Sequence, residues 1–111
     1  MDESLRDALC ARLAQIEGVT EATSRFGHEN RVAWRAGSRE IAHLHSSEVI
    51  DIRVPATLQR QWRGDSRLMP RPRRSDWIEC RFGSAQDVEF VAMLVEVAAN
   101  ASRGTASRRQ A

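Results

Sequence analysis

Apolar residues recur at helical spacing near both ends of the chain. Residues 4–17 carry one apolar stripe, with apolar side chains every three or four positions at Leu5, Leu9, Leu13 and Ile16. Ser4 and Asp7 fit a capping box at the start of this predicted helix, and Gly18 suits its end. Residues 84–101 carry a second stripe, formed by Val88, Val91, Val95 and Ala98. The sequence therefore predicts two amphipathic helices, each with one face to bury.

Between these helices, short segments alternate apolar and polar residues, as half-buried strands do. The alternation predicts five strands, at residues 19–26, 31–35, 39–45, 49–54 and 76–82. Pro55, with Leu58 and Trp62 four apart, predicts a short helix that ends at Gly64. Residues 67–75 contain two prolines and no periodicity, so we expect a loop there.

The two central strands predict a hairpin with a defined register. In the first strand, alternation places Glu40 with Ala42 and Leu44 on one face, and Ile41 with His43 and His45 on the other. A three-residue loop, Ser46 to Glu48, pairs Leu44 with Ile50 and Ala42 with Ile52, which gives one apolar face. A two-residue loop mixes polar and apolar residues on both faces. The favoured register places His43 opposite Asp51.

These elements predict an α+β fold. Strands joined by short turns are antiparallel, and two helices with single apolar stripes need a sheet face to cover. We therefore expect a two-layer sandwich in which an antiparallel sheet of about five strands carries the N- and C-terminal helices on one face. Residues 1–101 form the single domain, and residues 102–111 are expected to be a disordered basic tail.

Composition narrows the class of protein. The 111 residues suffice for one core without disulfides. Cys10 and Cys80 fall in separate elements, and the chain shows no signal peptide and no apolar run long enough for a membrane span. We therefore expect a reduced, soluble, cytoplasmic protein without a membrane partner. The sequence also lacks a phosphate loop, zinc-spaced cysteines and a nucleophile elbow, so it predicts no cofactor.

The face of the sheet opposite the helices holds the candidate ligand-binding residues. His43 beside Asp51 is an arrangement typical of a general base or an oriented metal ligand, and arginines with a tryptophan supply anion contacts and stacking. The candidates are Arg35, His43, His45, Asp51, Arg53 and Trp77. The competing interpretation is a solvated face, since antiparallel sheets commonly leave one face in water.

Metal binding is the weakest of the options for this face. His43 and His45 supply two imidazoles, a third ligand must be Asp51 or Glu79, and the face has no cysteine. The sequence therefore assigns no metal ligands and no catalytic residues.

Basic residues gather in one segment. All 17 basic residues are arginine, and residues 56–74 hold six of them with one aspartate. Arg71, Arg73 and Arg74 are candidates for binding an anion such as a nucleic-acid phosphate. A solvated arginine-rich loop explains the same pattern.

Three segments resemble a known family. REIAHLHSSEVIDIRVP at residues 39–55, RLMP at 67–70 with SDWIECRF at 75–82, and SAQDVEFV at 84–91 are similar to the small bacterial luciferase-domain, or luciferase-like, proteins. The resemblance implies a compact α+β fold and no particular reaction. Flavin-dependent bacterial luciferases are barrels of more than twice this length, which this chain cannot form. The order of elements also resembles YjbR-type DNA-binding proteins, whose fold is similar to that of the CyaY frataxins.

Three functional hypotheses follow. The favoured one is a small non-catalytic binding or interaction module for a small ligand or a protein partner, because no nucleophile, base and orienting group assemble. The second is a nucleic-acid-binding protein that uses the Arg60–Arg74 segment. The third is a small enzyme or metal protein centred on His43, His45 and Asp51.

Overall fold

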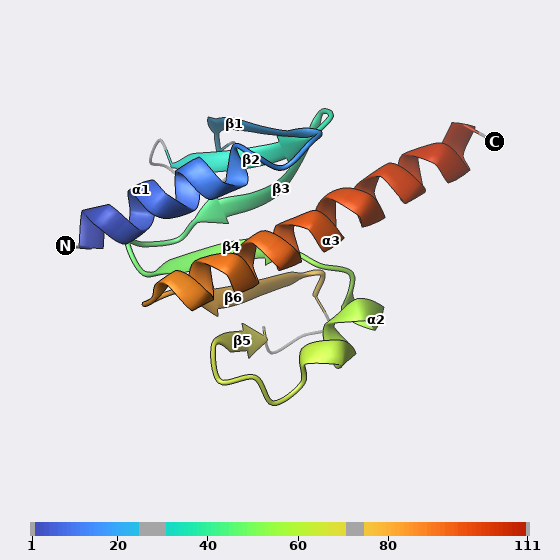
Figure 1. The fold of residues 1–111 in the computed structure, drawn as a ribbon. Helices are drawn as coiled ribbons and strands as arrows, with labels where there is room; N and C mark the ends of the chain where they lie inside the picture. The colour runs from blue at the N-terminus through green and yellow to red at the C-terminus, as the bar shows by residue number, and fades with distance from the viewer. Residues whose placement is uncertain (1, 25–30, 71–74, 111) are drawn as a thin grey trace.

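The fold is a sheet with two helices on one face. The computed structural model describes residues 2–24, 31–70 and 75–110. Helix α1 (Asp2–Leu13) and helix α3 (Ala85–Gln110) lie side by side across the same face of the sheet (Figure 1). After α1, turns lead to Gly18, whose φ of +82° favours glycine. The predicted α+β fold with terminal helices is confirmed.

The sheet is antiparallel and has six strands in the order β1-β2-β3-β4-β6-β5. Their bounds are β1 Val19–Thr23, β2 Val32–Ala36, β3 Arg39–Leu44, β4 Val49–Arg53, β5 Leu68–Pro70 and β6 Trp77–Arg81. The short helix after Pro55 is α2 (Ala56–Gln59), followed by a 3-10 turn at Arg60–Trp62.

Strand β5 corrects the prediction of a loop at residues 67–75. It pairs Leu68 with Cys80 and Met69 with Glu79 at the edge of the sheet. Three residues are too few to show alternation, and an edge strand tolerates Pro70 because one side of it needs no backbone donor. The sheet therefore has one strand more than the five in the sequence pattern.

The β3–β4 hairpin has the predicted register. Ala42 lies opposite Ile52, His43 opposite Asp51, and Leu44 opposite Ile50. The His45 amide donates to the Val49 carbonyl over 2.8 Å, which closes the hairpin around its turn. The interpretation that a three-residue loop aligns the apolar residues is confirmed.

A β-bulge between β2 and β3 changes the faces of two residues. Trp34 lies opposite Ala42, but the next residue, Arg35, lies opposite Glu40, so Ile41 is the extra residue on β3. Ile41 is fully buried in the core. The prediction that placed Glu40 with Ala42 and Leu44, and Ile41 with the histidines, was wrong at these two positions, because alternation holds only along a regular strand.

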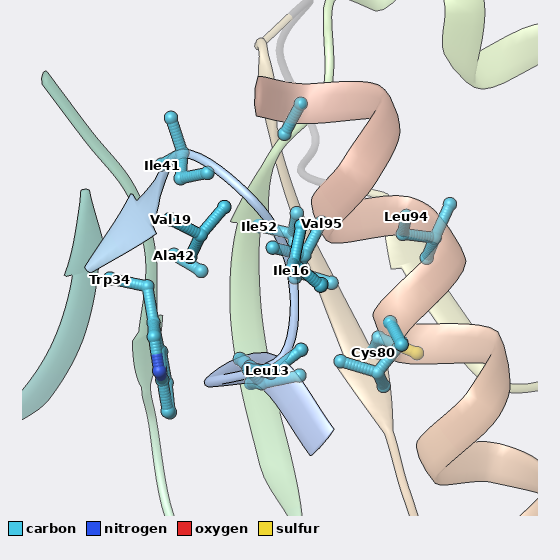
Figure 2. Close-up of a cluster of buried hydrophobic side chains, with 14 of the residues drawn as sticks. Leu13, Ile16, Val19, Trp34, Ile41, Ala42, Ile52, Cys80, Leu94 and Val95 are labelled. Atoms are coloured by element: carbon cyan, nitrogen blue, oxygen red, sulfur yellow. The ribbon is translucent and has the colours of Figure 1, made fainter. Parts of the chain in front are cut away.

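The core lies between the sheet and the helices. Val91, Leu94 and Val95 of α3 are fully buried. Ile78 of β6 and Phe82, which directly follows β6, are each 1% exposed. Figure 2 shows Leu94 and Val95 beside Cys80 and Ile52, with Trp34 and Leu13 in the same cluster. The predicted packing of the last helix on the apolar sheet face is confirmed.

Helix α3 extends beyond its predicted end. The sequence places that end near residue 101, whereas the helix continues to Gln110 and its last turns project past the sheet (Figure 1). These turns contain three arginines and no proline, and the helix continues through Gly104.

Candidate functional site

The face of the sheet opposite the helices carries a buried group of charged side chains. Glu40 and His43 come from β3 and Asp51 from β4, and at 8%, 8% and 1% exposure they are all buried. The bulge brings Glu40 onto this face, and the hairpin register sets His43 opposite Asp51. The interpretation of a solvated open face is therefore wrong at its centre, where the polar groups are paired and buried.

His43 lies between two carboxylates. Its Nδ1 is 3.0 Å from Glu40 Oε2, and its Nε2 is 2.9 Å from Asp51 Oδ2. Ser24 Oγ donates to Glu40 Oε2 over 2.9 Å. A neutral imidazole has one N–H, and an ionised carboxylate only accepts hydrogen bonds. A neutral imidazole can therefore donate to only one of these carboxylates, whereas a protonated imidazole donates to both.

His45 is the accessible histidine. Its side chain is 47% exposed, and its Nδ1 lies 3.3 Å from Asp51 Oδ2. In the part of the chain that the structure describes, its Nε2 has no hydrogen-bond partner. Because Asp51 orients the ring through Nδ1, Nε2 is the atom presented to a ligand. Glu40, His43, Asp51 and His45 are called the polar cluster below.

This geometry changes the roles expected for the two histidines. The sequence hypothesis has His43 oriented by Asp51 for contact with a ligand, with His45 beside it. Both nitrogens of His43 are instead within hydrogen-bond distance of carboxylates, and its side chain is 10% exposed. His43 therefore positions Asp51, and Asp51 positions His45.

Trp77 borders the cluster. Its ring centroid lies 5.0 Å from that of His43, at an interplanar angle of 40°. One face of the half-buried indole is thus occupied by His43. Arg53 lies opposite Trp77 across β4 and β6. Arg35, opposite Glu40, donates from Nη2 to the Thr23 carbonyl over 3.5 Å. These two arginines flank the polar cluster from separate strands.

Glu79 adds a third carboxylate to the exposed side of the cluster. It lies opposite Asp51 across β4 and β6 and is half-buried. One ligand atom from each of His45, Asp51 and Glu79 falls within 4.8 Å of the others. The sequence placed Glu79 on this face but not among the candidate ligand residues. Only the pairing of β4 with β6 brings it to Asp51, and the sequence does not reveal which strands are neighbours.

Glu40 was also missed. Alternation places Glu40 on the same face as Ala42 and Leu44, where an acidic side chain does not match the apolar neighbours. This mismatch is the signal that could have indicated a bulge. Ser24 follows β1 and gave no comparable signal.

The arginine-rich segment is only partly described. Arg71, Arg73 and Arg74 lie outside the described residues, and Arg60 and Arg63 are exposed. Arg67 Nη2 lies 2.8 Å from Asp65 Oδ2, and Arg67 Nη1 lies 3.4 Å from Asp87 Oδ1. The guanidinium carbon of Arg67 lies 3.7 Å from the centroid of the Phe90 ring. Hydrogen bonds from Arg67 lower the pKa of Asp65 to about 2. Arg67 is therefore engaged within the fold rather than presented to an anion.

A separate groove of about 670 Å³ lies where the β3–β4 turn meets the start of α3. Its lining includes Ser47, Ser66, Arg67, Arg81 and Asp87. Arg67, which lines this groove, is already paired with Asp65 and Asp87.

The comparison with protein families bears on the whole of this region. A family model described as Luciferase domain matches residues 38–98, more than half of the chain. The chain belongs to the luciferase-domain family. The match includes every member of the polar cluster together with Glu79 and confirms the resemblance inferred from the three sequence segments. The likeness to YjbR-type proteins stays a prediction.

The other comparisons add no relative to this luciferase-domain protein. Neither the curated proteins nor the solved structures gave a match. Within residues 2–24, 31–70 and 75–110, no helix is long and apolar enough to cross a membrane.

Proposed function

We propose that this luciferase-domain protein is a small binding module whose ligand contacts His45 at the exposed end of the polar cluster. The observation that carries the proposal is the burial of Asp51, whose Oδ2 lies within 3.3 Å of a nitrogen of each of two histidines. The ligand is a small molecule or ion that interacts with the exposed imidazole of His45.

The energetic cost of the cluster supports this proposal. Taking a charged group out of water costs several kcal/mol, and a buried ion pair is often no more stable than apolar residues of the same volume. A domain of this size has only about 5–15 kcal/mol of net stability. The pairs among Glu40, His43 and Asp51 are therefore a weak source of stability, and a role in positioning His45 accounts for them better.

The surroundings of His45 favour binding over nucleophilic catalysis. The nearest hydroxyls along the chain belong to the turn, where Ser46 Oγ accepts a hydrogen bond from the Glu48 amide over 3.3 Å. Cys80 is fully buried on the core face, and burial raises the pKa of its thiol to about 12. In the described part of the chain, no activated nucleophile accompanies His45.

The proposal is tested by ligand screening with the metal-free protein. Uniformly ¹⁵N-labelled protein in EDTA is titrated with small carboxylic acids, organic phosphates and phenols, and amide shifts are mapped by NMR. We expect at least one class to shift amides of β3, β4 and β6 around His45, and we expect His45→Ala to remove these shifts. Glu48→Ala, an exposed change in the same turn, is the matched control.

Two outcomes contradict the proposal. In the first, every responding compound shifts amides around the groove near Ser66 and Asp87, and His45→Ala leaves the shifts unchanged. In the second, neither these compounds nor Zn²⁺ added after removal of EDTA shifts any amide at millimolar concentration.

A further inference from the structure

We propose that His45, Asp51 and Glu79 form a binding site for a divalent transition-metal ion. This inference rests on the proposed function, because it names the ligand class that the exposed end of the polar cluster takes. The sequence ranks metal binding last among the options for this face. The structure favours it, because the pairing of β4 with β6 brings Glu79 to Asp51 and His45 is accessible.

The backbone fixes the three ligands on neighbouring strands. Asp51 and Glu79 are direct partners across β4 and β6, and His45 continues β3, two residues beyond His43, which is the partner of Asp51. The three ligand atoms lie within 4.8 Å of one another. Around a tetrahedral ion with bonds of about 2.1 Å, ligand atoms are about 3.4 Å apart. Small side-chain rotations of the more exposed His45 and Glu79 close that difference while Asp51 stays in place.

Charge around the three ligands favours a cation. Two carboxylates directly opposite each other across an antiparallel pair repel, as Asp51 and Glu79 do here. Asp51 Oδ2 already attracts nitrogens of both His43 and His45. A divalent ion held by the three side chains neutralises the repulsion between the two carboxylates.

The residues behind the ligands have the arrangement that metal sites use. Ligating carboxylates and imidazoles are commonly held by hydrogen bonds from a second layer of side chains, which fixes their orientation. Here His43 Nε2 lies 2.9 Å from Asp51 Oδ2, and the other nitrogen of His43 lies 3.0 Å from Glu40 Oε2. Asp51, at 1% exposure, is therefore already fixed for binding.

The donor set selects the class of metal. One imidazole and two carboxylates suit Zn²⁺, Mn²⁺, Co²⁺ or Ni²⁺, whereas Ca²⁺ and Mg²⁺ prefer oxygen ligands alone. Cys80 Sγ donates toward the Arg81 carbonyl and its residue lies in the core, so no thiolate joins the site. Three protein ligands leave at least one coordination position for water or a second polar ligand.

The test uses untagged full-length protein stripped with EDTA. Isothermal titration with Zn²⁺, and separately with Mn²⁺, should give one ion per chain, with Ca²⁺ at least tenfold weaker. His45→Ala and Glu79→Gln should each weaken binding by about 100-fold, and His43→Gln by about 10–100-fold because it acts through Asp51. Glu48→Gln, an exposed acidic residue in the same hairpin, should bind as the wild type does.

A spectroscopic measurement identifies the ligands directly. Co²⁺ added to the stripped protein should give visible absorption bands that are lost in His45→Ala. Affinity should also fall as pH drops and protons compete for the imidazole. Circular dichroism of each variant establishes that a loss of binding is not a loss of folding.

Several outcomes overturn the metal site. They are stoichiometric binding that survives both His45→Ala and Glu79→Gln, equal affinity for Ca²⁺ and Zn²⁺, or no binding at millimolar metal. If organic compounds still shift the amides around His45 in EDTA, such a result overturns the metal site alone and leaves the binding module standing.

Discussion

Replacement of Asp51 by alanine is the sharpest test of the polar cluster. Asp51 is 1% exposed, and it faces His43 at 2.9 Å and His45 at 3.3 Å. Removing one partner from a buried charge pair costs about 3–5 kcal/mol, and His43 then keeps only Glu40, 3.0 Å away. Out of a net stability of about 5–15 kcal/mol, this is a large fraction.

Urea unfolding followed by tryptophan fluorescence measures the loss. With an m-value of about 1.5–2 kcal/mol/M, Asp51→Ala should lower the midpoint by about 2–3 M. Glu48→Ala, which removes an exposed carboxylate nearby, should change the free energy of unfolding by less than about 0.5 kcal/mol.

A double-mutant cycle separates the ion pair from the packing of Asp51. In the His43→Leu background the His43–Asp51 pair is already absent, so adding Asp51→Leu should cost much less than Asp51→Leu alone. If the two changes add within about 0.5 kcal/mol, or if Asp51→Ala unfolds at the wild-type midpoint, the buried pair does not exist as described.

Four further predictions concern the rest of the fold. Leu94→Ala should cost about 2–5 kcal/mol in urea unfolding, and a wild-type midpoint would refute the packing of α3. Deleting residues 104–111, which include the last turns of α3 that project past the sheet, should change the melting temperature by less than about 2 °C. The thiol of Cys80, with its pKa raised to about 12 by burial, should resist Ellman's reagent at pH 8 until urea is added. Hydrogen bonds from Arg67 lower the pKa of Asp65 to about 2 from 3.8. The stabilisation of the fold by these Arg67–Asp65 hydrogen bonds should therefore be present above pH 4 and be lost as the pH falls from 4 to 2. It should be absent in Asp65→Asn.

The hairpin shows what the sequence can specify. Its register depended only on alternation and on the length of one loop, and one loop length alone gave a consistent apolar face. The last helix was equally clear because its stripe is regular. Both predictions use information local to about 15 residues, which is where sequence patterns are strongest.

Which strands lie beside the hairpin depends on contacts between residues far apart in the sequence, and no local pattern reveals these contacts. The pairing of β4 with β6 joins Asp51 to Glu79 across about 28 residues of chain, and β5 then adds Met69 beside Glu79. Sequence order placed Glu79 on the correct face but could not specify its partner. For this reason the sequence named Glu79 only as an alternative to Asp51 for a third metal ligand, and did not place the two carboxylates together.

Polarity alone also fails to distinguish a solvated side chain from a buried, paired one. His43 and His45 were assigned to the same polar face, yet His43 is buried between two carboxylates and His45 is exposed. The bulge at Ile41 decides the difference. In a regular β3 strand, Glu40 would point to the core side and His43 would have one carboxylate, Asp51, instead of two. By turning Glu40 onto the polar face, the bulge occupies the second nitrogen of His43 and leaves His45 as the histidine that can reach a ligand.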